Sequence, residues 1–295
     1  MSQTRAQIEQ EGYYIVKGLL TVEEVNECKK EIRNIIEKWY ETFERNGFAE
    51  GNDWEEICDR LPSIKDGSRP MPSDKEMSIR KLFRMAVHTE YFRKLAQHPK
   101  IIPYCKQYLG EDVKLLQSMS LLKPPGSSEK IWHQDNAYFR LTPCKVMGCW
   151  IALDEATVQN GCMHVLPRCH KNGVWEHSSS LDSHIDYGMV DIPDPSKVVP
   201  IELSPGDALL FDGELPHYTP KNSTTDKTRR AVQFHYASGA CKPIKCPPKE
   251  EQPAVVPDEK KVGHFDCAPC IEPIYWCYRK AELLVCGKDY GGDHI

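Results

Sequence analysis

The sequence predicts a mainly β protein with flanking helices and a double-stranded β-helix core, the jelly-roll or cupin-like fold. Two observations indicate this fold class. Helical patterns fall in the first 112 residues, and from there to about residue 240 the chain consists of short apolar segments separated by turn signals. Many short strands with such punctuation are typical of a sandwich or barrel.

The N-terminal residues predict a short helix, a strand and a second helix in succession. Residues 3–20 contain the short helix and then a strand around Tyr13–Val16, with Gly18 as a break. Thr21 and Glu24 form a capping-box pattern, which marks the start of the second helix.

The second helix and the residues after it complete the helical part of the chain. Apolar residues recur at helical spacing up to Asn46-Gly47, where a glycine stop is expected. Residues 48–78 are polar and interrupted by prolines, which predicts an irregular connection. Two further helices are expected over 88–97 and 99–109.

The core tract reads as a series of short strands. Turn signals at Pro124-Pro-Gly126, Asn160-Gly161 and Pro205-Gly206 separate them. Residues 171–198 are polar and too long for a hairpin loop, a length typical of a lid. Strands are expected over 113–122, 129–135, 146–154, 162–166, 199–203, 207–211 and 229–238.

Composition indicates an ordinary globular protein that acts on small molecules. A net charge of -5 without a dense basic block argues against nucleic acid or an anionic membrane as the main partner. No apolar run approaches the ~20 residues that span a bilayer, and the N-terminus lacks an apolar signal region. Thirteen cysteines without framework spacing suit reduced thiols. We therefore expect a cytoplasmic protein.

A histidine and an aspartate two positions apart are the first candidate functional pair. On a strand, both side chains of such a pair lie on one face. Burying them costs several kcal/mol unless a partner such as a divalent metal neutralises them. Only the first of three copies of this pattern lies in an expected strand; the other two follow polar or Pro- and Lys-rich stretches. The copies are His133/Asp135, His184/Asp186 and His264/Asp266.

His217 is the candidate for a third ligand. A tight turn at Pro205-Gly206 begins an apolar strand, and a Gly- and Pro-rich corner presents His217 at its end. Two histidines and one carboxylate form the facial triad of non-haem Fe(II) oxygenases. The same ligands can hold catalytic zinc, and a buried hydrogen-bonded network without metal would also satisfy them.

An arginine that enters the last expected strand is the candidate anion-binding group. A buried guanidinium needs an anion, and a dicarboxylate bound to iron would offer its far carboxylate for a bidentate pair. Alternation gives the strand a polar face and a packing face, and we assign the role to Arg229 on the polar face. The polar face is Arg229, Ala231, Gln233 and His235, and the other is Arg230, Val232, Phe234 and Tyr236.

With these residues in place, the chain resembles the phytanoyl-CoA dioxygenase family of Fe(II)- and 2-oxoglutarate-dependent oxygenases. The resemblance implies that His133, Asp135 and His217 bind iron and that Arg229 binds the C5 carboxylate of 2-oxoglutarate. It also implies that four residues line the cosubstrate pocket: Gln134, Trp150, Met119 and Thr219. The motifs that carry it are Gly12-Tyr13, Gly18-Leu-Leu20, Lys123-Pro-Pro125, His133-Gln-Asp135, Trp150, Asn160-Gly-Cys162, Pro205-Gly-Asp207, His217 and Arg229.

The resemblance implies a dioxygenase that hydroxylates a small-molecule substrate and releases succinate and CO2. It would use Fe(II), 2-oxoglutarate as cosubstrate and O2, with ascorbate as a possible addition. Asp135 argues against the halogenase variants, in which a small residue replaces the carboxylate. Residues 1–295 would form a single oxygenase domain, in which 1–112 is mainly helical support, 113–240 is the core and 241–295 is a Cys- and Pro-rich extension.

Two features depart from the family pattern or bear on the substrate. Arg168 follows the NG turn where the family often has a small residue, and it would bring a charge to the rim of the site. An acyl-CoA substrate would need basic groups for its phosphates, and nothing in the sequence demands CoA. The loose candidates for such groups are Arg80, Lys81, Arg84, Lys242 and Lys245.

Alternatives remain for the function and for the C-terminal extension. The fold could carry a cupin metalloenzyme of another kind, such as a zinc hydrolase or an oxygenase without a cosubstrate, or a non-catalytic binding protein. Cys267 and Cys270 could form a structural zinc site, a redox pair or an ordinary reduced loop. The sequence does not define the substrate or the oligomeric state.

Overall fold

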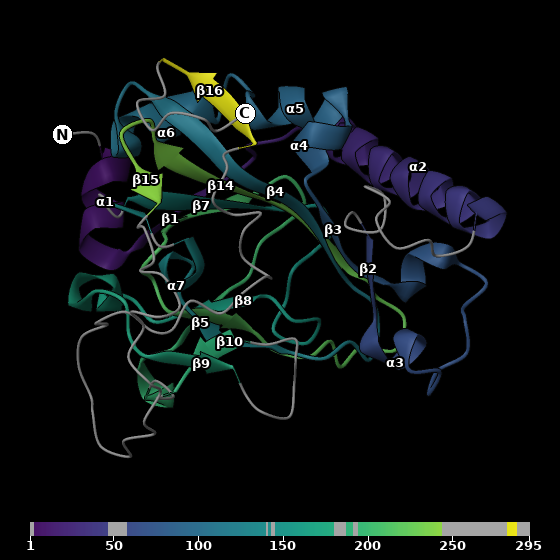
Figure 1. Ribbon diagram of the computed structural model, residues 1–295. Coiled ribbons are helices and arrows are strands. Elements are labelled where there is room, and N and C mark those ends of the chain that lie inside the picture. The colour runs from purple at the N-terminus through teal and green to yellow at the C-terminus, as the bar shows by residue number, and fades with distance from the viewer. Residues whose placement is uncertain are drawn as a thin grey trace, which may run out of the picture.

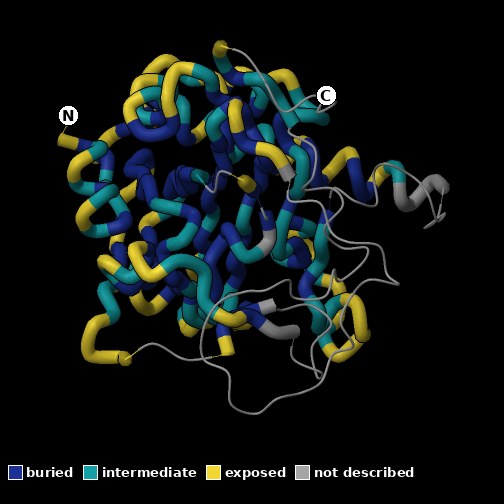
Figure 2. Tube along the Cα trace, turned by 60° about the vertical axis from the view of Figure 1, so that its left-hand side comes forward, coloured by how far each residue is buried: buried dark blue, intermediate teal, exposed yellow. Residues whose placement is uncertain are grey.

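The computed structural model describes residues 3–46, 58–139, 141–142, 145–179, 187–190, 194–243 and 282–287. A large antiparallel sheet lies between a layer of helices and a smaller antiparallel sheet (Figure 1). Buried residues gather along the strands at the centre, and exposed residues lie at the periphery (Figure 2). The predicted mainly β fold with flanking helices is confirmed.

Most of the helices lie in the first 112 residues, as predicted. The capping box forms: Thr21 N donates to Glu24 Oε2 at 2.7 Å, and Glu24 N donates to Thr21 Oγ1 at 3.3 Å. Within the described ranges, no helix is long and apolar enough to cross a membrane. The α-helices are α1 (Gln3–Glu11), α2 (Val22–Asn46), α3 (Pro62–Lys65), α4 (Met85–His88), α5 (Glu90–Ala96), α6 (Ile102–Leu109) and α7 (Asn136–Phe139), and the 3-10 helices are η1 (Lys75–Ser78), η2 (Cys169–Asn172) and η3 (Pro195–Lys197).

The large sheet runs in the order β1-β12-β7-β14-β4-β3-β2, and β16 pairs with β4 beside this path. Strand β16 comes from the C-terminal extension, so part of that extension belongs to the core sheet. The strands are β1 (Tyr13–Val16), β2 (Cys58–Arg60), β3 (Ile79–Phe83), β4 (Val113–Lys123), β7 (Val146–Ala152), β12 (Ala208–Asp212), β14 (Arg229–Ser238) and β16 (Leu283–Cys286).

The small sheet has the order β11-β8-β13-β5. Two short ribbons accompany it, one formed by β9 and β10 and one by β6 and β15. The strands of the small sheet are β5 (Lys130–His133), β8 (Met163–Val165), β11 (Val199–Ile201) and β13 (His217–Thr219); those of the ribbons are β6 (Leu141–Thr142), β9 (His177–Ser179), β10 (Tyr187–Met189) and β15 (Lys242–Pro243).

Alternation along the large sheet separates two hydrophobic clusters. On β7, Cys149 and Ile151 pack with residues of the helices, whereas Trp150 packs with residues of the small sheet. On β14, Phe234 lies on the helix side and Ala231 on the small-sheet side. The period of two therefore places a face of each central strand in the space between the sheets. The candidate site lies there.

In the part of the connection 48–78 that the structure describes, residues 58–78, the chain forms regular elements. Strands β2 and β3 extend the large sheet at its edge, and α3 and η1 lie between them in the chain. The prolines fall outside these strands, and edge strands this short carry little alternation. For that reason the sequence pattern predicted an irregular segment.

Gly148 allows Phe211 to reach the space between the sheets. A Cβ atom added at Gly148 would lie 2.2 Å from Phe211 Cζ, inside a buried strand pair. The ring of Phe211 in turn lies edge-on to that of His217, with 4.9 Å between the ring centroids. The glycine therefore sets the position of an aromatic ring next to a candidate ligand.

Gly148→Ala is expected to lower the free energy of unfolding by ~1–3 kcal/mol, because overpacking forces the ring or the strand to shift. Urea denaturation measures the change. Adding Phe211→Leu, which removes the crowded ring atoms, should recover part of the loss in a double-mutant cycle. A Gly148→Ala protein as stable as the parent would contradict this reading of the contact.

Candidate active site

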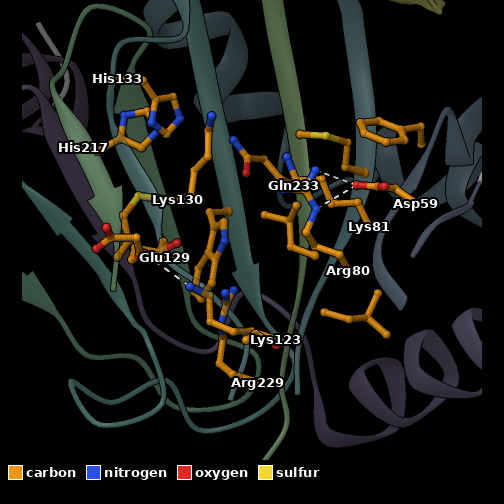
Figure 3. Close-up of a pocket in the computed structure, with 18 of the residues that line it drawn as sticks. Asp59, Arg80, Lys81, Lys123, Glu129, Lys130, His133, His217, Arg229 and Gln233 are labelled. Atoms are coloured by element: carbon orange, nitrogen blue, oxygen red, sulfur yellow. Dashed lines mark hydrogen bonds and ion pairs between the residues drawn. The ribbon is translucent and has the colours of Figure 1, made fainter. Parts of the chain in front are cut away.

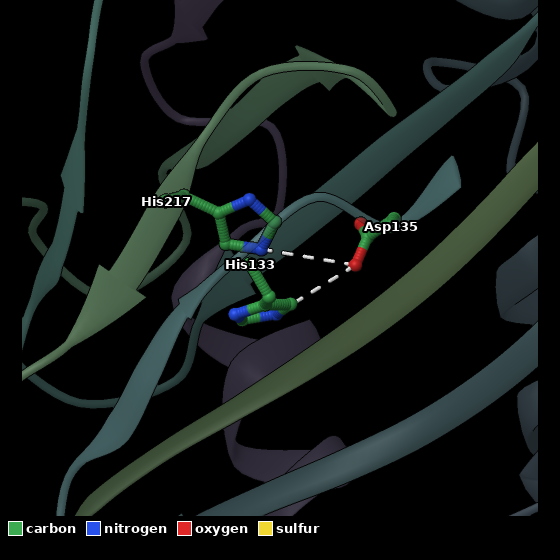
Figure 4. A group of neighbouring side chains, drawn as sticks. All are labelled: His133, Asp135 and His217. Atoms are coloured by element: carbon green, nitrogen blue, oxygen red, sulfur yellow. Dashed lines mark ion pairs between the residues drawn. The ribbon is translucent and has the colours of Figure 1, made fainter. Parts of the chain in front are cut away.

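His133, Asp135 and His217 meet between the two sheets (Figure 4). His133 ends β5 and His217 begins β13, and these strands pair so that the two histidines are directly opposite. One ligand atom from each of the three residues lies within 4.8 Å of the others. Each histidine Nε2 is 3.8 Å from Asp135 Oδ1. Two segments far apart in the chain thus meet at one point.

Backbone carbonyl groups fix the tautomers of both histidines. His133 Nδ1 donates to Ile131 O at 2.8 Å, and His217 Nδ1 donates to Leu215 O at 2.9 Å. A carbonyl oxygen only accepts, so Nδ1 carries the hydrogen in each ring. The Nε2 lone pairs then face Asp135. A metal-bound imidazole usually donates its other ring N–H to such a backbone carbonyl.

The electrostatics of the group suit a divalent cation. Burial lowers the pKa of both histidines, and the facing rings lower the pKa of His133 further. Burial alone would raise the pKa of the Asp135 carboxyl, but the facing His235 and His217 lower it below its ordinary value. The donor set is therefore two neutral imidazoles and one carboxylate.

His235 supports Asp135 from β14. Its Nε2 lies 2.8 Å from Asp135 Oδ2. Because an ionised carboxylate only accepts, His235 Nε2 carries the hydrogen and donates it. This bond occupies Oδ2 and leaves Oδ1 facing the two histidines. The sequence placed His235 on the polar face of its strand, but its partner depends on the fold.

A cavity of about 320 Å³ extends from the candidate ligands between the sheets (Figure 3). His133 and His217 lie at one end, Arg229 lines the cavity further along, and Asp59, Arg80 and Lys81 lie on the side of β2 and β3. Asp59 pairs with Arg80 at 2.6 Å and with Lys65 at 2.6 Å. The sequence analysis named Arg80 and Lys81 only as loose basic candidates, and it did not predict Asp59 or the strands that carry these residues.

Arg229 is the buried cation of this cavity. It is 2% exposed, and its Cζ lies 5.2 Å from the centroid of the Trp150 ring. Arg229 Nε and Nη1 and Trp150 Nε1 have no hydrogen-bond partner among the described residues. Burial lowers the pKa of Arg229 to about 10, which leaves it charged at neutral pH. A buried charge with open donors requires an anion.

Arg230 points to the other face of β14, as alternation predicts. Its Nε donates to Asp154 Oδ2 at 2.7 Å, and its Nη1 donates to Glu76 Oε1 at 3.1 Å. The two consecutive arginines therefore have different surroundings. Arg230 is paired within the protein, and Arg229 lines the cavity.

Three of the four other predicted pocket residues line the cavity, namely Met119, Trp150 and Thr219. Gln134 does not, and that prediction is corrected. Its Nε2 donates to Gly173 O and Glu214 O, and its Oε1 accepts from Trp175 N at 2.6 Å. Strand β5 ends at His133, short of the expected residue 135, and the hydrogen bonds of Gln134 in the segment after it tie neighbouring loops together instead.

The remaining sequence candidates fall into three groups. Arg168 is exposed and pairs with Glu11 at 2.9 Å outside the cavity, so it brings no charge to the rim of the pocket. Of the loose basic candidates, Arg80 and Lys81 line the cavity, whereas Arg84 and Lys242 do not. The candidates that lie outside the described residues are Lys245, Cys267, Cys270 and the two further His-x-Asp copies.

The fold and the site together define a class of protein: a double-stranded β-helix with the two-histidine, one-carboxylate triad of the non-haem Fe(II) oxygenases. The family profile described as "Phytanoyl-CoA dioxygenase (PhyH)" matches residues 8–231. The chain therefore belongs to the phytanoyl-CoA dioxygenase family and is a non-haem Fe(II)- and 2-oxoglutarate-dependent dioxygenase.

Similar proteins span most of the chain. "Phytanoyl-CoA dioxygenase domain-containing protein 1" of Danio rerio is 26% identical over 257 residues, which cover 76% of this chain and 86% of that protein. "Phytanoyl-CoA dioxygenase, peroxisomal" of Rattus norvegicus is 26% identical over 248 residues, or 80% and 68% of the two chains. The epimerase SnoN, solved with Fe3+, alpha ketoglutarate and nogalamycin RO, has a TM-score of 0.62 and 20% identity over 88% of this chain and 93% of its own.

Proposed function

We propose that the protein hydroxylates a small-molecule substrate, with His133, Asp135 and His217 holding Fe(II) and Arg229 holding the C5 carboxylate of 2-oxoglutarate. The observation that carries this proposal is the buried, charged Arg229, whose open donors face the cavity that contains the three ligands. A structural metal site would have no use for such a cation. The metal complex of SnoN with alpha ketoglutarate supports the pairing of metal and cosubstrate on this fold.

Different residues would bind the metal and position the cosubstrate. The three ligands present two neutral nitrogens and one anionic oxygen and leave further metal positions open. Trp150 lies beneath the guanidinium of Arg229, so it limits the positions that a bound carboxylate can take. When bound, Fe(II) and 2-oxoglutarate supply the oxidising chemistry, in which O2 is consumed, 2-oxoglutarate yields succinate and CO2, and one oxygen atom enters a substrate C–H bond.

Anaerobic reconstitution with Fe(II) and 2-oxoglutarate tests the proposal. After admission of O2, succinate is measured across panels of acyl-CoA, lipid, alkaloid and amino-acid substrates. We expect succinate formation that requires Fe(II) and rises with a true substrate. Complete absence of 2-oxoglutarate binding would remove the proposal and favour a zinc hydrolase or an oxygenase that needs no cosubstrate.

His235→Ala is expected to weaken Fe(II) binding by ~10–100-fold, the usual effect of losing the hydrogen-bond partner of a metal ligand. The reason is that Asp135 Oδ2 would lose its donor and the carboxylate would be free to turn. Anaerobic calorimetric titration with Fe(II) measures the affinity. His235→Gln, which can place an amide donor near the same point, should recover part of it.

His164→Ala is the matched control for this variant. His164 is also a buried histidine of the core, at 8% exposure, but its ring bonds to Cys162 O and lies beside Tyr218 rather than beside Asp135. Equal losses of Fe(II) affinity in the two variants would show that His235 acts only through general packing.

A further inference from the structure

Lys123 is a second buried cation beside Arg229. It is the last residue of β4, it is 6% exposed, and it lines the same cavity (Figure 3). Strands β4 and β14 pair so that Lys123 and Arg229 are directly opposite. Like charges at opposed positions destabilise a strand pair. The protein nevertheless places two cations there.

The hydrogen bonds of Lys123 match an ammonium group. Nζ donates to three backbone carbonyl oxygens: Ser128 O at 3.1 Å, Thr219 O at 3.3 Å, and Pro220 O. An ammonium has three hydrogens for these three acceptors, whereas a neutral amine has two. The carbonyls of residues 219 and 220 also follow His217 closely in the chain. The protonated form therefore ties β4 to the segment that carries a candidate ligand.

The charges around Lys123 oppose that protonated form. Burial lowers the pKa of Lys123 to about 6, helped first by Arg229 on β14, while Glu129 raises it and Lys81 and Arg80 on β3 lower it. The geometry favours the ammonium, and the surroundings favour the neutral amine. A carboxylate placed at Arg229 would remove this conflict, because it supplies the negative charge that two adjacent cations need.

We infer that Lys123 is a positioning residue of the cosubstrate site, and that binding of 2-oxoglutarate at Arg229 takes up a proton from solvent onto Lys123 Nζ. The inference rests on the proposed function. The proton adds to the amine lone pair, completes the third hydrogen bond to the backbone and leaves two cations facing a bound carboxylate. No covalent bond of the cosubstrate changes in this step.

The direction of the pH dependence follows from linkage. Without ligand, Lys123 loses its proton as the pH rises through about 6, and the bound carboxylate moves that loss to higher pH. Between the two pKa values, binding consumes protons, so the affinity for 2-oxoglutarate falls by up to tenfold for each unit of rising pH. Below the lower value, Lys123 is charged in both states and the affinity is independent of pH.

Calorimetric titration of 2-oxoglutarate into the anaerobic Fe(II)-loaded protein tests the inference. The titration is repeated at pH 7.5 in buffers with different ionisation enthalpies, and the slope gives the number of protons taken up. Loading the metal first keeps any proton released by the histidines out of the measurement. We expect a net uptake of up to one proton and a dissociation constant that rises between pH 6.5 and 8.5.

Three variants locate the proton. Lys123→Met should bind 2-oxoglutarate with no proton uptake and no pH dependence in this range. Lys123→Arg should also show no uptake, because a guanidinium stays charged throughout. Lys114→Met is the matched control, since Lys114 is a buried lysine of the same strand, at 2% exposure, whose Nζ bonds to Cys241 O away from the cavity. It should keep the uptake of the parent.

The outcomes separate the two proposals. Binding of 2-oxoglutarate without proton uptake by the parent protein would overturn the role of Lys123 and leave the proposed function intact. Uptake that persists in Lys123→Met or Lys123→Arg would also overturn it. Failure of the parent to bind 2-oxoglutarate at any pH would instead overturn the proposed function itself.

Discussion

His133→Ala is expected to abolish succinate formation and to weaken Fe(II) binding by more than ~100-fold, beyond the effect of losing an outer hydrogen-bond partner. The variant removes one of two imidazoles and leaves a single nitrogen and Asp135 to hold a hydrated cation. His133 is also buried, at 8% exposure. Anaerobic Fe(II) titration and a succinate assay with 2-oxoglutarate measure the two effects.

The controls for His133→Ala separate metal loss from unfolding. His164→Ala removes a buried histidine from β8, which β13 separates from β5 in the same small sheet, and should keep both Fe(II) binding and succinate formation. Circular dichroism of both variants should match the parent, because an empty ligand set does not support the fold. Substantial succinate formation by folded His133→Ala protein would contradict the assignment of the triad.

The period-two alternation of strands accounts for most of what the sequence could predict about the site. It predicted that His133 and Asp135 share one face, and it separated Arg229 from Arg230. The rule does not extend to Gln134, because β5 ends at His133; the hydrogen bonds of Gln134 to loop backbone hold it outside the cosubstrate pocket. The family resemblance implied a pocket role for Gln134. In the structure its side chain bonds to the backbone of Gly173 and Trp175 instead.

Contacts that depend on strand register could not be predicted from the sequence. Lys123 and Arg229 are more than a hundred positions apart, and they become neighbours only because β4 and β14 pair in one particular register. His235 on β14 and Asp135 in the turn after β5 are likewise brought together only by the fold. The basic residues of β3 were recognised as loose candidates, but their place at the cavity follows from the pairing of β3 with β4, and the sequence analysis did not predict a strand at β3.

Arg229→Ala is expected to weaken 2-oxoglutarate binding by at least ~30-fold, because truncating one partner of a buried charge pair costs about 2–5 kcal/mol. Calorimetric titration of the Fe(II)-loaded variant measures the loss, and Fe(II) affinity itself should change little. A metalloenzyme that needs no 2-oxoglutarate would keep its activity in this variant, which distinguishes the main alternative.

Arg230→Ala is the matched control. We expect it to lose more stability than Arg229→Ala and to keep its affinity for 2-oxoglutarate. Arg230 is paired with Asp154 and Glu76, so its removal takes one of two cationic partners from each carboxylate and should lower the free energy of unfolding. Arg229 in the ligand-free protein has open donors within the described residues, so its removal relieves an uncompensated charge and should cost less stability. If Arg230→Ala instead lost 2-oxoglutarate affinity while Arg229→Ala kept it, the anion site would lie on the other face of β14.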